Sequence, residues 1–307
     1  MCIVTMPNSR AASSTSCPYR DAPPARRTLT PATMLRSLPL RGTAGAGARR
    51  GDDGTPGVGG ARGPSWARGG AAREEAGRGG GAPGPFGAVL IVLGALAYSV
   101  WLLELPLATG LDPVQSYVSE LAATDQPLGA LFRTADLVAG VLLLAAALPL
   151  LVAARRRFWA ATGWAALALF GAATAADSRL PLSCAPTADT ACAAREDAGL
   201  VPFTHAAHAV SSGLAMAGAV TAVVALTVAA RRYGWWPPLA RTGPVLVVLE
   251  LAATAWTLVA VAGFEAGRGH WALGAGQRAQ LLLVAVWLLL LAWSLRAARA
   301  TRTGARR

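Results

Sequence analysis

The sequence predicts an all-α, polytopic membrane protein in which a bundle of six transmembrane helices follows a disordered N-terminal tail. Hydrophobic residues make up 54% of the 307-residue chain and charged residues only 14%, a balance that is rare among soluble globular proteins. The apolar residues occur in long blocks rather than in the short alternating strands of a membrane barrel. Each block approaches the ~20 residues with which a helix crosses ~30 Å of hydrocarbon. The six predicted spans are residues 86–107, 133–154, 158–176, 205–230, 243–264 and 277–297.

The flanking segments differ sharply in composition from the spans. Residues 1–84 are rich in Gly, Ala, Pro, Ser and Arg, and such a segment buries too little apolar surface to offset the entropy of ordering it. We therefore expect a disordered cytoplasmic tail there; the alternative is that part of it is an over-extended gene start, with Met34 as a later start. Residues 85–298 form the predicted six-helix domain, and 299–307 a basic cytoplasmic tail.

The basic residues predict the topology of the chain. All 28 are arginine, and they cluster on every second connection, whereas the other connections carry the acids. This is the positive-inside pattern, which predicts a plasma-membrane protein with both termini in the cytoplasm. The expected partners are the lipid bilayer and anionic lipids bound by cytoplasmic arginines, with no nucleic acid; no feature indicates an oligomeric state. The clustered arginines are Arg155, Arg156 and Arg157, then Arg231, Arg232 and Arg241, then Arg296, Arg299, Arg302, Arg306 and Arg307.

Polar residues are predicted to gather at the outer ends of the helices. His205, His208 and either Ser212 or Ser211 lie three or four positions apart and so share one helix face. Because polar groups are costly in a bilayer, such a layer is a functional-site hypothesis, although hydrogen-bonded caps at the interface would produce the same pattern. The predicted layer contains Glu104, Glu120, Arg133, Asp136, Asp177, His205, His208, Ser212, His270 and Arg278.

Two shorter spacings predict local bonds. Arg133 and Asp136 are three apart, which favours an intrahelical ion pair. Cys184 and Cys192 lie eight apart on what the topology makes the oxidising side, so a disulfide is expected between them. The alternative for the cysteines is a metal site, but no nearby Cys or His supplies a ligand set of the usual spacing.

Several short motifs resemble those of one known family. They are Ser116-Tyr117-Val118-Ser119-Glu120, then Gln126-Pro127, then Arg133 followed by Asp136-Leu137-Val138-Ala139-Gly140. The likeness extends through the cysteine-bearing loop, the paired histidines and Gln277-Arg278, over about residues 86–297. The chain is similar in these features to an actinobacterial multi-pass membrane family described as domain of unknown function 998 (DUF998). The resemblance implies six membrane helices and no established activity.

We favour a non-enzymatic membrane protein with no cofactor, whose outer polar pocket binds a lipid headgroup or a small ligand. In this interpretation Arg278 and Arg133 meet a phosphate and His205 responds to pH.

Two other classes of function remain open. The first alternative is a zinc-dependent intramembrane lipid hydrolase, similar to membrane ceramidases only in placing His and Asp near the outer leaflet. Its metal ligands would be His205, His208, His270 and Asp177. The second alternative is a small-solute transporter, which requires polar groups near mid-membrane; only Glu250 approaches that depth.

Overall fold

The computed structural model describes residues 85–304, and the predicted tail at 1–84 lies outside the described residues. Across the described part of the chain every regular element is a helix. Six of these helices are long and apolar enough to cross a membrane, which confirms the predicted fold class.

The helices follow one another with short connections at one end of the bundle and long ones at the other. Two short elements, η2 (Val118–Ala122) and α5 (Thr190–Asp197), lie in the long connections. The spanning elements are α2 (Pro85–Tyr98) with η1 (Val100–Glu104), α3 (Gly129–Ala154), α4 (Phe158–Asp177), α6 (Phe203–Arg232), α7 (Pro237–Glu265) and α8 (Leu273–Gly304).

Two spans differ in form from the continuous helices that the sequence predicts. The first changes from α-helix to 3-10 helix at Ser99, whose Oγ donates to the Ala95 carbonyl oxygen at 2.8 Å. The fifth begins earlier than expected, because Pro237 and Pro238 occupy its first turn, where a missing N–H costs no helical hydrogen bond.

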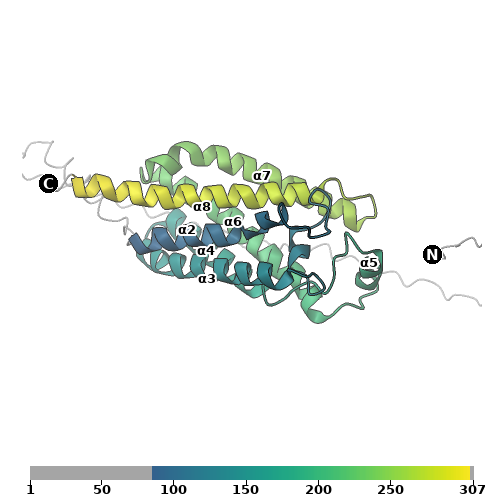
Figure 1. Ribbon diagram of the computed structural model, residues 1–307. Coiled ribbons are helices and arrows are strands. Elements are labelled where there is room, and N and C mark those ends of the chain that lie inside the picture. Colours follow the sequence, from purple (N-terminus) through teal and green to yellow (C-terminus); the bar gives the residue numbers. More distant parts are fainter. Residues whose placement is uncertain (1–84, 305–307) are drawn as a thin grey trace, which may run out of the picture. The chain divides into compact units, whose positions relative to one another are not determined.

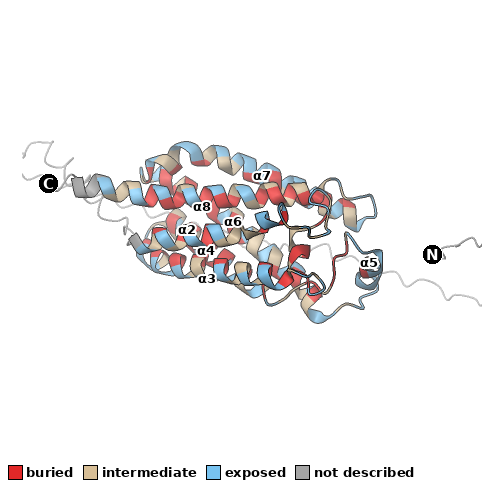
Figure 2. Cartoon of the chain, viewed as in Figure 1, coloured by how far each residue is buried: buried red, intermediate tan, exposed pale blue. Residues whose placement is uncertain are grey.

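The six spanning helices pack in a closed ring with the order α2, α3, α4, α6, α7, α8 and back to α2 (Figure 1). We call the end that carries η1, η2 and α5 the α5 end, and the opposite end, with the turns at 155–157 and 233–236, the arginine-rich end. The main apolar core lies in the half nearer the arginine-rich end, where Leu226, Trp287 and Leu291 are buried. Large apolar side chains such as Val248 and Leu258 on α7 are exposed on the outside of the ring (Figure 2).

Glycine allows a close contact between α3 and α4. A Cβ on Gly171 would lie 2.7 Å from the Gly140 carbonyl oxygen and 2.7 Å from the Leu144 nitrogen, so only glycine permits this separation of the two backbones. Gly213 on α6 is different, because a Cβ there would meet nothing within 4 Å. Gly213 is thus no helix-packing glycine.

Candidate functional site

A buried ion pair fixes the start of α8 against the first span. Arg278 Nε and Nη2 donate to the two carboxylate oxygens of Glu104, each at 2.6 Å. Arg278 Nη1 also donates to the carbonyl oxygens of Ser116 at 2.9 Å and Gly274 at 3.1 Å. All of its charge-assisted bonds therefore go to the chain itself. The guanidinium that the sequence predicts to contact a phosphate is instead bound to Glu104.

A second buried carboxylate joins the two long loops. Glu120 in η2 is fully buried and accepts hydrogen bonds from the Thr187 backbone N–H at 2.7 Å and from its hydroxyl. Burial raises the pKa of Glu120, while the bonds from Thr187 oppose the shift. Nearby, Arg133 Nη1 donates to the carbonyl oxygens of Ala122 and Ala123 at 2.6 and 3.2 Å.

The expected ion pair between Arg133 and Asp136 does not form in the part of the chain that the structure describes. Arg133 extends toward the end of η2 and uses its guanidinium on backbone carbonyls. Asp136, three residues further into α3, faces the interior of the ring instead. The reason is that the carbonyls of Ala122 and Ala123, at the end of η2, lie within reach of Arg133 and need donors.

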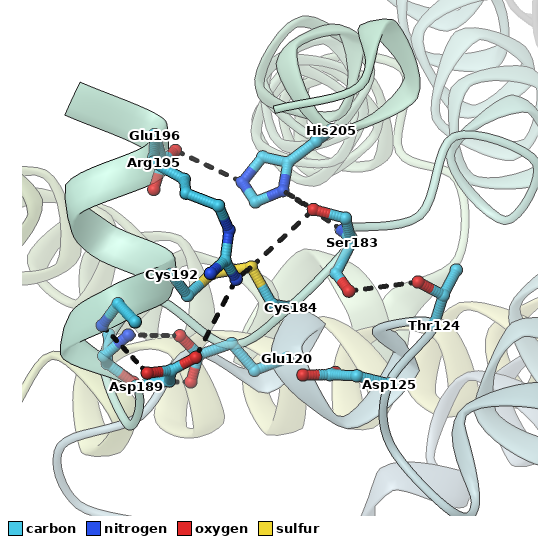
Figure 3. Close-up of a disulfide and its surroundings, with 12 residues drawn as sticks. Glu120, Thr124, Asp125, Ser183, Cys184, Asp189, Cys192, Arg195, Glu196 and His205 are labelled. Atoms are coloured by element: carbon cyan, nitrogen blue, oxygen red, sulfur yellow. Dashed lines mark hydrogen bonds and ion pairs between the residues drawn. A yellow bond between two sulfur atoms is a disulfide. The ribbon is translucent and has the colours of Figure 1, made fainter. Parts of the chain in front are cut away.

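The loop between α4 and α6 folds over the first histidine. Cys184 and Cys192 form a disulfide that ties this loop to α5 (Figure 3). The Ser183 backbone N–H donates to His205 Nδ1 at 3.1 Å, so Nδ1 is an acceptor and a neutral ring carries its proton on Nε2. His205 Nε2 in turn lies 3.4 Å from Glu196 Oε1, as Figure 3 shows. His205 is buried; Ser183 holds Nδ1 by hydrogen bonds, whereas Nε2 has the Glu196 contact but no hydrogen bond among the described residues.

The second histidine has a carboxylate partner. His208 Nδ1 lies 3.0 Å from Asp177 Oδ1 and 3.1 Å from the Leu180 carbonyl oxygen. Both neighbours are acceptors, so Nδ1 carries a proton and Nε2 of a neutral ring has a free lone pair. The Ser211 hydroxyl also donates to Asp177 Oδ1. Of the two serines considered from the sequence, Ser211 therefore joins this group, whereas the Ser212 hydroxyl bonds to its own helix at Ala209.

A cavity of about 410 Å³ lies inside the ring in the half nearer the α5 end. This volume lies within the range of ~300 to 1,000 Å³ that small-molecule sites occupy. Apolar side chains such as Phe170, Met216 and Val284 form its deeper walls. The predicted residues that line it are Asp136, Asp177, His205, His208 and Ser212.

Several residues that line this cavity have a buried polar atom with no hydrogen-bond partner among the described residues. These atoms are Trp101 Nε1, Thr174 Oγ1, His205 Nε2, Thr257 Oγ1 and Gln280 Oε1. Leaving such a group unsatisfied costs ~1 to 3 kcal/mol. Apart from His205, none of these residues belongs to the polar layer that the sequence predicts. The available signal was an isolated Thr or Gln inside an apolar span, which is costly in a bilayer unless it has a partner.

Other predicted residues lie elsewhere. Glu104, Glu120, Arg133 and Arg278 hold the loops together and do not line the cavity. His270 packs on Phe264 with ring centroids 5.0 Å apart and is also outside the cavity lining. Within residues 85–304 no three His, Cys, Asp or Glu side chains are grouped so as to hold a metal ion, so His205, His208, His270 and Asp177 do not converge on one point.

The family model for the protein family of unknown function DUF998 matches residues 91–294. The chain belongs to the DUF998 family. The match covers all six spanning helices apart from the first residues of α2 and the end of α8. Searches of curated proteins and of solved structures returned no match. Membership of DUF998 thus identifies an integral membrane protein and carries no activity with it.

Proposed function

We propose that this DUF998 protein binds a lipid headgroup or a small ligand in the cavity at the α5 end. The observation that carries the proposal is that cavity-lining residues of η1, α4, α6, α7 and α8 have buried polar atoms without a hydrogen-bond partner among the described residues. Buried polar groups in native proteins are almost always hydrogen-bonded. A ligand that supplies the missing partners would offset the cost of burying them.

Two features support an extracytoplasmic location for this site. Arg155, Arg156 and Arg231 lie at the opposite end of the bundle, where the positive-inside rule places the cytoplasm. The disulfide between Cys184 and Cys192 lies at the α5 end, and disulfides persist on the oxidising side of a membrane. The ligand would then come from the outer leaflet or from outside the cell.

Native mass spectrometry of the purified full chain tests this function. We expect wild-type protein to retain a co-purified molecule of defined mass, and the double variant Thr257→Val/Gln280→Leu to retain it at least tenfold less. The matched control is Thr221→Val, which removes an exposed hydroxyl from α6 that does not line the cavity. The proposal is wrong if wild type carries no adduct, or if the control loses it equally.

A second candidate is a hydrolase, and the contact of Asp177 with His208 favours it. A carboxylate that holds Nδ1–H leaves Nε2 able to act as a general base or as a metal ligand. Metal analysis of wild type against His208→Ala distinguishes this candidate. Stoichiometric zinc that is lost on substitution would promote the hydrolase, and metal-free wild-type protein would retire the zinc-dependent form of it.

A further inference from the structure

The charge of the cavity differs from what a phosphate ligand requires. Four carboxylates line it, from Asp136, Asp177, Glu196 and Glu265. None of the described residues that line it is an arginine, and the sequence contains no lysine. A site that binds an anion presents arginine, lysine or backbone N–H groups. This lining instead favours a ligand whose head carries positive charge.

Asp136 is the carboxylate that is available to such a head. Asp177 already accepts from Ser211 and pairs with His208. Glu196 and Glu265 are exposed at the mouth of the cavity. Asp136 is partly buried on α3, and no described residue forms a hydrogen bond or ion pair with it. A carboxylate in apolar surroundings is stabilised most by a cation placed directly against it.

Exposed residues of both α6 and α7 line the cavity, which favours a lateral opening of the cavity between these two helices. These helices pack together near the arginine-rich end, where a Cβ on Gly243 of α7 would lie 2.7 Å from the Thr227 side chain of α6. Toward the α5 end they separate, and α6 runs away from α7 to the other side of the bundle (Figure 1). Gly213 of α6 and Leu258 of α7 both line the cavity, and both are exposed.

The opening lies at the depth of acyl chains. Gly213 is ten residues into α6, about 15 Å along the helix axis at ~1.5 Å per residue. The 30 residues of α6 extend over about 45 Å, beyond the ~30 Å of hydrocarbon. If α6 is centred in the bilayer, Gly213 lies several ångströms below the polar boundary. A molecule in the cavity therefore reaches lipid tails through the gap without passing through water.

Building on the proposed function, we propose that the ligand is an amphiphile with an amine-bearing head. The ammonium group lies against Asp136, and the alkyl chain leaves between α6 and α7 past Gly213 and Leu258. The hydroxyl of Thr257, the amide of Gln280 and the indole of Trp101 form hydrogen bonds with the polar atoms next to the amine. The apolar walls contact the first part of the chain.

Photolabelling with three matched probes tests this proposal. Each probe has the same sixteen-carbon chain with a mid-chain diazirine and ends in a primary amine, a hydroxyl or a carboxylate. The full chain is labelled in nanodiscs of phosphatidylcholine, and labelled residues are located by mass spectrometry. We expect the amine to label the cavity-lining residues of α6 and α7 at least tenfold more than the carboxylate does. Asp136→Asn should lower amine labelling about tenfold and leave hydroxyl labelling unchanged.

Two variants on α6 separate the opening from general membrane contact. A Cβ at Gly213 meets nothing within 4 Å, and Gly213→Trp should reduce cavity labelling by all three probes. Val210→Trp places the same side chain on an exposed position that does not line the cavity and should change nothing.

The outcomes distinguish this proposal from the one it rests on. Equal labelling by amine and carboxylate, or indifference to Asp136→Asn, overturns the amine-bearing head. Indifference to Gly213→Trp overturns the lateral opening. In each of these cases probes still enter the cavity, so ligand binding as such survives. If no probe labels the cavity above the level seen at Val210, this inference fails, and native mass spectrometry decides whether the cavity binds any ligand.

Discussion

Arg278 and Glu104 form the buried pair that anchors the first span to the last. Both side chains are buried, and the guanidinium has further acceptors in Ser116 and Gly274. When one partner of such a pair is removed, the other remains as an uncompensated charge, which costs more than the pair contributes in net stability.

We predict that Arg278→Leu lowers the free energy of unfolding in detergent by ~3 to 5 kcal/mol. The double variant Glu104→Gln/Arg278→Leu should recover part of this loss, because no unpaired charge remains. Thermal and denaturant unfolding followed by tryptophan fluorescence measure both effects. If the stability losses of Arg278→Leu alone and Glu104→Gln alone simply add in the double variant, the two side chains are not coupled and the interpretation is wrong.

Glu120 makes the stability of the folded protein depend on pH. Its pKa is raised by burial, so the folded protein holds the Glu120 proton more tightly than the unfolded chain does. The stabilisation from this proton is complete below the unfolded value of ~4.3 and is lost as the pH rises through the folded pKa. Glu120→Gln keeps an acceptor for the Thr187 N–H but removes the titration.

We therefore expect the Tm of Glu120→Gln, relative to that of wild type, to be highest at neutral pH. This advantage of the variant should shrink toward pH 4. Parallel thermal melts of the two proteins across this range measure the difference. An advantage that grows on acidification would show that the carboxylate is stabilised in its charged form, contrary to this account.

At the scale of single helices, the contact between α3 and α4 depends on two glycines. Gly171→Leu would force a side chain against the backbone of Gly140 and Leu144, and we predict a loss of at least ~1 to 3 kcal/mol from overpacking. Gly213→Leu is the matched control, because its side chain has open space and leucine favours helix over glycine. Detergent-stability assays on both variants should rank Gly171→Leu well below Gly213→Leu, and the reverse order would contradict the packing described here.

The helices themselves could be predicted from the sequence, because the apolar length of each span is a property of one segment. The partner of each polar side chain could not. Glu104 and Arg278 are 174 positions apart, and spacing within a helix says nothing about which helices are neighbours in the ring. The placement of His205 and His208 on one face was predictable from their spacing, whereas the loop that covers His205 and the role of Ser211 depend on tertiary structure. The cavity residues Thr257 and Gln280 were missed for the same reason.

At the scale of the whole molecule, the membrane topology determines which leaflet and which side of the membrane the cavity opens to. The arginine distribution predicts that the turn at 155–157 faces the cytoplasm and that the α5 end faces outward. We expect a membrane-impermeant maleimide to label Asp125→Cys but not Arg156→Cys in intact cells, in a background where Cys2 and Cys17 are serine. Both positions are exposed in the structure. Labelling of the Arg156 position from outside would show that the protein has the opposite orientation, with the cavity in the inner leaflet.

The cavity at the α5 end is a binding site in this interpretation, not a packing defect. Cryo-electron microscopy of the full chain in lipid nanodiscs, with a bound antibody fragment to add mass, tests this most directly. We predict density inside the ring that contacts Asp136, Thr257 and Gln280 and continues as a chain between α6 and α7. A map in which these side chains close on one another and fill the space would contradict the central claim.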